Sequence, residues 1–219
     1  CGIDPRKAYD RRALKGHGKS PFVMLDITTQ QAANVSKRCI LLKRMYALWG
    51  HGRTLNEALH SIQAMSDSDG VDHQSLFRSQ QSWSLEVSSH CRKLSVNDQA
   101  LVRDAASKYL RFEGPVSLRN ADIQIWIIFV YKRKKKEVAA QDDAAATKIT
   151  TAGDVELQLS EDPHAYLDSV YIGRAIGAGQ RHLIKRYSLK TRPFIGPTST
   201  SSELALLMAN QARIKPGSL

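Results

Sequence analysis

The chain is poor in cysteine, and its few cysteines are not spaced for a metal site or a disulfide framework. Only Cys1, Cys39 and Cys91 occur among 219 residues, and no two of them form a C-x-x-C pair. The seven histidines are scattered without ligand spacing, so no residue is assigned to a metal. This pattern excludes a secreted disulfide scaffold and fits a reducing compartment, from which we expect a cytoplasmic protein.

Long apolar runs are also missing. The longest one, Ile123 to Tyr131, is interrupted by Gln124 and falls far short of the roughly 20 residues that a membrane-spanning helix needs. The chain shows no signal-peptide pattern. Hydrophobic residues still make up 42% of the sequence, which is enough to bury a core. We therefore expect a folded protein that has no membrane partner.

Acidic residues are scarce in two parts of the chain. The formal net charge is +11, residues 1–66 hold eleven Lys/Arg against four Asp/Glu, and residues 174–192 hold six Lys/Arg and no acid. Basic clustering of this kind is the electrostatic footprint of a nucleic-acid partner, and it would also suit an anionic membrane surface. The plain alternative is a solvated surface that keeps the protein soluble.

Hydrophobic periodicity and helix-start signals predict an α+β fold. Strands are expected over residues 22–27, 40–49, 83–87, 123–131 and 165–176, with a small extra strand near 155–159. Helices are expected over residues 28–39, 54–65, 95–110, 179–187 and 200–212. Three of them begin with a capping box, at Thr28/Gln31, Thr54/Glu57 and Thr200/Glu203. No βαβ unit repeats, which disfavours a doubly wound sheet.

Two short segments, residues 50–52 and 132–136, could be either functional or merely structural. Gly50-His51-Gly52 has no nucleophile or carboxylate beside it in the sequence, so we interpret it as a tight turn that ends a strand. The run Lys132 to Lys136 opens an Ala- and Asp-rich stretch that we interpret as a surface insertion.

The basic stretch near residue 180 has the spacing of a one-sided helix. Lys185 and Arg186 follow Arg181 by four and five residues. The three side chains can therefore share one side of a helix and face several phosphates together. The alternative is an ordinary amphipathic helix whose Leu183, Ile184 and Tyr187 face inward while the basic residues are solvated.

The order of motifs near the end of the chain resembles a known family. The sequence contains Tyr171-Ile-Gly-Arg174, then Gly179-Gln-Arg-His-Leu-Ile-Lys-Arg-Tyr187, then Arg192-Pro-Phe-Ile-Gly-Pro-Thr-Ser199, then Met208-Ala-Asn-Gln-Ala-Arg-Ile-Lys-Pro-Gly217. It is similar to the junction between the THUMP module and the methyltransferase domain of the tRNA guanine-10 N2-methyltransferases. Gly18-Lys-Ser-Pro-Phe22, Tyr46 to Gly52 and Phe112-Glu-Gly114 extend the resemblance towards the start of the chain.

The resemblance implies a domain organisation and a set of contact residues. Residues 1–53 would form part of a ferredoxin-like unit, 54–188 a THUMP-type RNA-binding module with an insertion at about 132–160, and 189–219 the lead-in to a Rossmann-like methyltransferase domain. The expected RNA contacts are Arg174, Arg181, Lys185, Arg186, Lys190, Arg192, Lys43 and Arg44. Thr198 and Ser199 would supply an edge of the methyl-donor pocket.

The catalytic motifs of that family are missing here. The chain has no Asp-Pro-Phe-x-Gly-Thr-Gly and no Asp-Pro-Pro-aromatic sequence, so we expect no catalytic residue, no bound cofactor and no methyl transfer in this chain alone. The resemblance implies that the longer parent uses S-adenosylmethionine. It also implies tRNA as the partner of this chain and a small zinc-binding activator protein as the partner of the catalytic domain. The alternatives are a non-catalytic THUMP-type RNA-binding or ribonucleoprotein assembly protein, and a THUMP-bearing thiolation or pseudouridylation enzyme.

Overall fold

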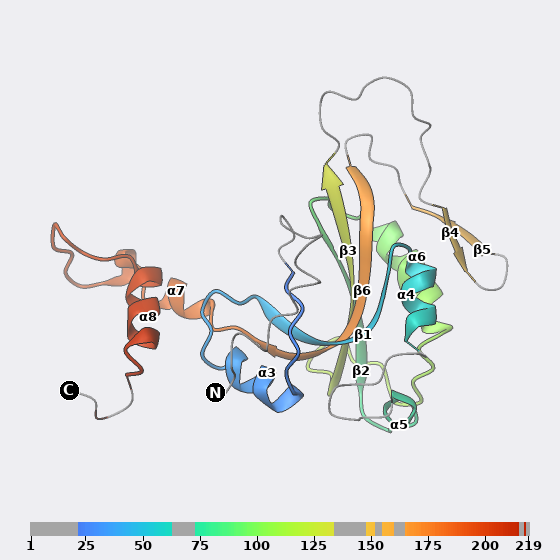
Figure 1. The fold of residues 1–219 in the computed structure, drawn as a ribbon, viewed down its shortest axis with the longest axis horizontal. Coiled ribbons are helices and arrows are strands. Elements are labelled where there is room, and N and C mark those ends of the chain that lie inside the picture. Colours follow the sequence, from blue (N-terminus) through green and yellow to red (C-terminus); the bar gives the residue numbers. More distant parts are fainter. Residues whose placement is uncertain are drawn as a thin grey trace, which may run out of the picture. The chain divides into compact units, whose positions relative to one another are not determined.

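The computed structural model describes residues 22–62, 73–133, 148–151, 155–159, 165–214 and 217. The chain divides into two compact units (Figure 1). One unit is Ala47–Ala175, and the other combines Cys1–Tyr46 with Ile176–Leu219. The residues expected to form the last module therefore share a unit with the start of the chain, which sequence order alone did not suggest.

A four-stranded mixed sheet forms the centre of the unit 47–175. Its strand order is β1-β6-β3-β2, and the bounds are Arg44–Gly52 for β1, Trp83–His90 for β2, Ile123–Arg133 for β3 and Ala165–Ala178 for β6. Strand β3 pairs parallel with β2 and antiparallel with β6, and the second pairing has an irregularity between Val130 and Tyr131. The two long strands β3 and β6 lie side by side in Figure 1.

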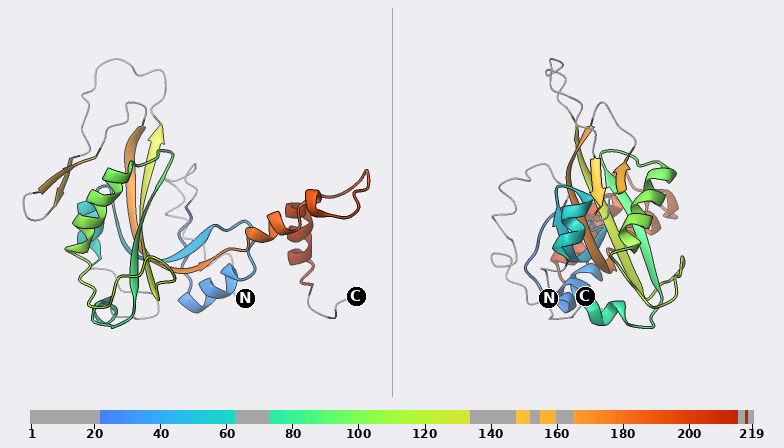
Figure 2. Two further views of the ribbon diagram at one scale, coloured as in Figure 1. Left: turned by 180° about the vertical axis from the view of Figure 1, so that it is seen from behind. Right: turned by 90° about the vertical axis from the view of Figure 1, so that its right-hand side faces the viewer.

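Helices α4 (Leu55–Ser61) and α6 (Val96–Ser107) cover one face of this sheet (Figure 2). Helix α6 makes the crossover between the parallel strands β2 and β3, so the unit contains a single βαβ element. Alternate residues of β3 point into the core, as the strand period of two requires. The buried core residues of this strand are Ile123, Ile125, Ile127, Phe129 and Tyr131. The predicted α+β class is confirmed, with a mixed sheet rather than a doubly wound one.

The ends of these helices show how local sequence sets the elements. Ser95 caps α6: its hydroxyl accepts a 3.0 Å hydrogen bond from the N–H of Asp98, and the Asp98 carboxylate accepts one from the N–H of Ser95. Thr54 accepts from the N–H of Glu57 at 3.2 Å, as the sequence predicted. The Glu57 carboxylate, however, accepts from the N–H of Arg53 rather than from that of Thr54. The expected capping box therefore has only one of its two hydrogen bonds.

The prediction of a tight turn at residues 50–52 was wrong. Strand β1 continues through Gly52, with His51 exposed and its ring stacked 4.9 Å from that of Tyr171. The glycines are needed because α4 packs directly on the strand backbone. A Cβ at Gly50 would lie 2.2 Å from the carbonyl oxygen of Ala58, and one at Gly52 would lie 2.6 Å from its nitrogen.

Smaller elements complete this unit. Helix α5 spans His73–Phe77, and β4 (Lys148–Thr151) pairs antiparallel with β5 (Val155–Gln158). The small strand expected near 155–159 is therefore present, while most of the expected insertion lies outside the described residues. Leu101 in α6 is 40% exposed. The core is filled from the next residue, Val102, which is fully buried.

The unit formed by residues 1–46 and 176–219 is built mainly from short helices. They are α3 (Thr29–Ser36), α7 (His182–Arg186), the 3₁₀ turn η1 (Leu189–Thr191) and α8 (Ser202–Gln211). Helix α3 begins with the predicted capping box of Thr28 and Gln31. The strand expected over 22–27 does not form. In this segment only Leu25 makes an isolated β-bridge. Within the described ranges, no helix is both long and apolar enough to cross a membrane.

Helix α8 starts one residue later than its sequence predicted. Ser201, not Thr200, is the N-cap, and its hydroxyl accepts a hydrogen bond from the N–H of Leu204 at 3.4 Å. The reason lies in Ser202, which is buried and donates a 2.9 Å hydrogen bond to the carbonyl oxygen of Ile184 in α7. This contact holds Ser202 as the first helical residue.

Candidate nucleic-acid interface

A backbone clasp joins two segments that are far apart in the sequence. The N–H of Gly179 donates to the carbonyl oxygen of Lys43 at 3.3 Å, and the N–H of Gln180 donates to that of Cys39 at 2.8 Å. A Cβ at residue 179 would lie 2.0 Å from the carbonyl oxygen of Leu42, so only glycine fits. The clasp brings Lys43 next to the start of the basic segment that leads into α7.

Helix α7 separates basic from apolar residues. Arg181, Lys185 and Arg186 are exposed, whereas Leu183 and Ile184 are half-buried. Helix α7 contacts α8 through its backbone, since the carbonyl oxygen of Ile184 accepts the hydrogen bond from the Ser202 hydroxyl. The three basic side chains are exposed, and their sharing of one side of the helix stays a prediction.

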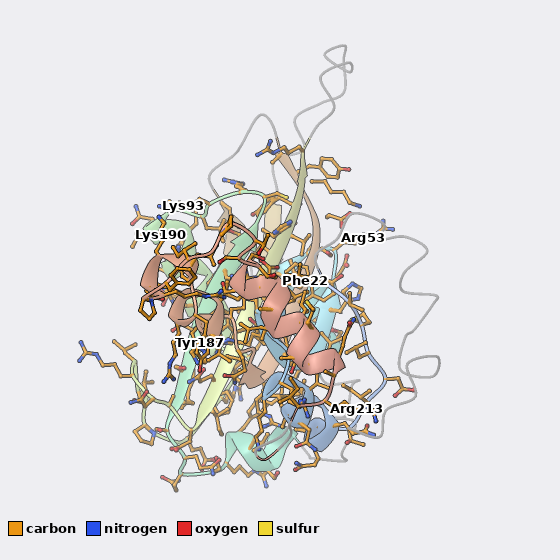
Figure 3. All side chains as sticks on the ribbon, turned by 90° about the vertical axis from the view of Figure 1, so that its left-hand side faces the viewer. Phe22, Arg53, Lys93, Tyr187, Lys190 and Arg213 are labelled. Carbon is orange, nitrogen blue, oxygen red and sulfur yellow. The ribbon has the colours of Figure 1, made fainter. Side chains whose placement is uncertain are left out.

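The chain after α7 forms a hydrogen-bonded turn in which a further basic residue, Lys190, is exposed. The Thr191 hydroxyl donates to the carbonyl oxygens of Arg186 at 3.2 Å and Ser188 at 2.9 Å. Lys190 lies in this turn and is exposed (Figure 3). Because two carbonyl groups hold the turn, the position of Lys190 relative to α7 is well defined.

The positive charge of this unit has little compensation. Its described residues, 22–46 and 176–214, hold ten Lys/Arg, and their acidic residues are Asp26 and Glu203. Most of these cations form no ion pair within the described part of the chain, and six of them lie at the clasp or along α7 and the segment after it: Lys43, Arg181, Lys185, Arg186, Lys190 and Arg192. An uncompensated cluster of this kind raises the local positive potential and attracts a polyanion. We call these six residues the cationic cluster.

Two of the expected contact residues are placed differently. Arg44 is the first residue of β1, and Arg174 lies in β6 opposite Ile125. Both are half-buried, as Arg192 is, and are therefore less exposed than the other five residues of the cationic cluster. Arg44 lies close to Tyr46, where burial raises the pKa of the phenol and the positive charge of Arg44 partly offsets that rise.

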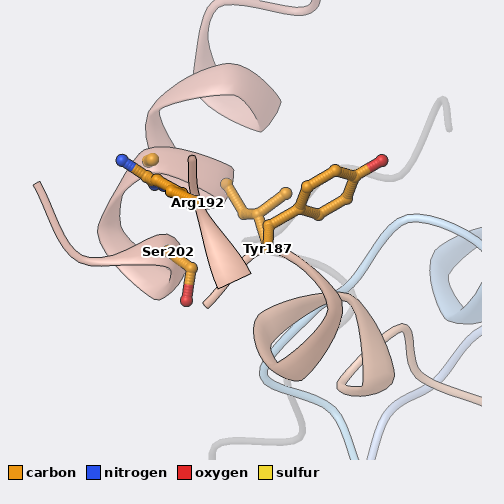
Figure 4. A pocket seen from close by; sticks show the side chains of 5 residues that line it. Tyr187, Arg192 and Ser202 are labelled. Atoms are coloured by element: carbon orange, nitrogen blue, oxygen red, sulfur yellow. The ribbon is translucent and has the colours of Figure 1, made fainter. Parts of the chain in front are cut away.

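A hollow of about 230 Å³ opens beside α8 in the same unit (Figure 4). It is lined by Tyr187, Arg192, Ser202, Ala205 and Leu206. Arg192 and Tyr187 extend to opposite sides of it. Arg192 was among the expected RNA contacts, whereas Tyr187 was considered only as an inward-facing residue of an amphipathic helix, and it is in fact 49% exposed. The signal that could have found Tyr187 is an aromatic residue at the end of a basic helix.

Thr198 and Ser199 lie in the turn before α8. Thr198 is exposed, and Ser199 is half-buried with its N–H bonded to the carbonyl oxygen of Gly196 at 3.1 Å. Neither residue lines the hollow. Among the described residues, no group of three or more His, Cys, Asp or Glu side chains could hold a metal ion.

The chain is similar to a THUMP family model and to proteins named as tRNA methyltransferases. A family model described as the Tmrp11 THUMP N-terminal domain matches residues 12–153. The chain is 30% identical over 204 residues to the tRNA (guanine(10)-N(2))-methyltransferase TRMT11 of Rattus norvegicus, covering 93% of this chain and 38% of the relative. It is 28% identical over 200 residues to TRMT11 of Homo sapiens, covering 91% and 37% of the two chains. The tRNA (guanine(10)-N(2))-methyltransferase of Saccharomyces cerevisiae is 27% identical over 201 residues, with 91% and 40% covered. The chain thus spans about two fifths of the length of these curated relatives.

Proposed function

The chain belongs to the family of the Tmrp11 THUMP N-terminal domain, and from this premise we propose that it is the tRNA-binding portion of a tRNA guanine-N2-methyltransferase. In this role it holds the tRNA while the exocyclic amine of guanine 10 is methylated elsewhere in the longer protein. The relatives that carry this activity by name support the proposal.

The cationic cluster is the observation that carries the tRNA-binding role. It gathers exposed Lys43, Arg181, Lys185, Arg186 and Lys190 in one unit through the clasp at Gly179. RNA duplexes are recognised mainly by shape and by their phosphate and 2′-hydroxyl groups, so unpaired cations on a rigid turn and helix suit such a partner. Contacts to phosphates position a nucleic acid and carry no sequence information. We therefore expect this chain to place the tRNA and not to select its sequence.

The methyl donor of such an enzyme would be S-adenosylmethionine, and Thr198 and Ser199 would supply one edge of its pocket. Thr198 is exposed, the Ser199 N–H is already bonded within its own turn, and neither lines the hollow beside α8. Their role as one edge of a donor pocket would need residues of the catalytic part.

The organisation of the longer protein follows from the same premise. Residues 54–188 would act as the THUMP-type module, 1–53 as part of a ferredoxin-like unit, and 189–219 as the lead-in to the catalytic domain. The compact units have other bounds, because 176–219 groups with 1–46. We also propose a cytoplasmic protein whose catalytic domain binds a small zinc-binding activator.

A matched pair of triple variants tests the tRNA-binding role. In the first, Arg181, Lys185 and Arg186 are changed to Ala; in the second, Arg78, Lys93 and Arg119 are changed to Ala. Both remove two arginines and one lysine from exposed positions, so they change the net charge equally. We expect the first to weaken tRNA binding at least tenfold more than the second, measured by filter binding or fluorescence anisotropy. Equal weakening would mean that net charge alone, rather than this cluster, attracts the RNA.

A further inference from the structure

The hollow beside α8 combines a free guanidinium with apolar walls. Arg192 is half-buried, and its backbone N–H donates to the carbonyl oxygen of Leu189 at 3.2 Å. Within the described part of the chain its guanidinium donates no hydrogen bond and forms no ion pair. A guanidinium carries five N–H donors in a planar fork that matches a phosphate. The guanidinium can therefore donate to a ligand that supplies the acceptors.

The opposite side of the hollow is aromatic. Tyr187 is 49% exposed although it follows a helix whose apolar residues are half-buried. Its backbone N–H bonds to the carbonyl oxygen of Leu183 at 2.9 Å, which fixes the residue at the end of α7. Leu206 and Ala205 also line the hollow. A flat ring could therefore be held against apolar side chains, with an aromatic ring at one side and a guanidinium at the other (Figure 4).

The size and the surrounding charge narrow the class of ligand. At about 230 Å³ the hollow is smaller than the roughly 300–1,000 Å³ of sites that enclose a whole cofactor or drug-sized molecule. The guanidinium carbon of Arg186 lies 5.7 Å from the centre of the Tyr187 ring, and Lys190 is exposed nearby in the chain. The surroundings are thus cationic, which favours an anionic ligand with one flat ring.

We propose that this hollow is a subsite for one unpaired nucleotide of a bound RNA, with the base against Tyr187 and Leu206 and its phosphate at Arg192. The inference rests on the proposed function, since the rest of the RNA would lie along the cationic cluster. Stacking of bases on aromatic side chains tolerates any base, and an arginine beside the ring supplies both charge and a second flat surface. The subsite would therefore distinguish unpaired from paired RNA and would not read sequence.

The test compares two RNAs on the 219-residue chain. One is a short blunt RNA duplex; the other is the same duplex with an unpaired overhang of a few nucleotides, placed at either end in turn. By fluorescence anisotropy we expect the overhang to tighten binding roughly tenfold. The variant Tyr187→Leu should abolish most of this gain and leave binding of the blunt duplex nearly unchanged. Arg192→Gln removes a charge from the cationic cluster, so it should weaken binding of both RNAs and also abolish most of the gain from the overhang.

Matched controls separate the subsite from general effects. Tyr166→Leu changes a tyrosine of the other unit that is 48% exposed, and Arg213→Gln changes an exposed arginine of the same unit. Both should keep the full gain from the overhang. An equal weakening of both RNAs by Tyr187→Leu, or no gain from the overhang in the unchanged chain, would overturn the subsite while leaving the cationic cluster intact. Failure of the unchanged chain to bind either RNA at low salt would overturn the subsite and the proposed function together.

Discussion

The backbone N–H of Gly179 donates a 3.3 Å hydrogen bond to the carbonyl oxygen of Lys43, across 135 intervening residues of sequence. This pairing, with the one between Gln180 and Cys39, brings a lysine from the first part of the chain beside the basic helix of the last part. The proposed RNA surface depends on it, because Lys43 would otherwise be separate from α7.

Replacing Gly179 with Ala should damage both the fold and the surface. The added Cβ would lie 2.0 Å from the carbonyl oxygen of Leu42, which is backbone and cannot rotate away. We expect a loss of about 1–3 kcal/mol in the free energy of unfolding, measured by urea denaturation, together with weaker tRNA binding. The control is Gly196→Ala, whose Cβ would meet its nearest atom at an ordinary 3.6 Å. If both variants were equally stable, the close approach at Gly179 would not exist in solution.

The position of the α8 cap can be tested with two neighbouring hydroxyls. Ser201 accepts the hydrogen bond from the N–H of Leu204, whereas Thr200, the cap predicted from sequence, is exposed and makes no such bond. Ser201→Ala should cost about 1 kcal/mol of stability, and Thr200→Ala should cost less than about 0.5 kcal/mol. Thermal melting followed by circular dichroism provides the comparison. If Thr200→Ala melted at a lower temperature than Ser201→Ala, Thr200 rather than Ser201 would be the N-cap.

The pair Ser82 and Asp122 should give the protein a pH dependence in acid. Ser82 donates to the Asp122 carboxylate through its hydroxyl at 2.6 Å and through its backbone N–H at 3.0 Å, and these bonds lower the pKa of the carboxyl. A lowered pKa in the folded state means that the contribution is present above the unfolded pKa and is lost as pH falls through the folded one. We therefore expect stability to decline below about pH 4, followed as melting temperature against pH.

The matched variants for this prediction are Asp122→Asn and Asp104→Asn. Asp104 is exposed, and its carboxylate accepts no hydrogen bond among the described residues. Asp122→Asn should flatten the acid limb of the stability curve, while Asp104→Asn should leave its shape unchanged. An identical acid limb in all three proteins would show that the Ser82 bonds do not lower this pKa.

The elements that the sequence predicted well are those that neighbouring residues determine. The box of Thr28 and Gln31 starts α3, and the β-branched run beginning at Ile123 forms the central strand β3. In both cases the cause lies within a few residues: free N–H groups at a helix start, and side chains that pack well on a pleated surface.

The features that sequence alone missed depend on contacts between distant residues. Gly50 and Gly52 look like turn residues, yet they serve the close packing of α4 against a continuous strand. Ser202 moves the start of α8 through its bond to Ile184. Similarly, the sequence predicted a basic face on α7, but not that Lys43 would lie beside it. A short stretch of sequence carries no information about contacts with residues that lie far away along the chain.

The salt dependence of tRNA binding tests the central claim most directly. Each phosphate contact releases condensed counterions, so the slope of log affinity against log salt concentration counts the contacts. We predict a steep negative slope for the unchanged chain. In the variant with Arg181, Lys185 and Arg186 changed to Ala, the slope should be shallower by about 2–3, while the variant with Arg78, Lys93 and Arg119 changed to Ala should keep the original slope. A slope that stayed the same in the first variant would contradict the assignment of these residues as the phosphate-binding surface.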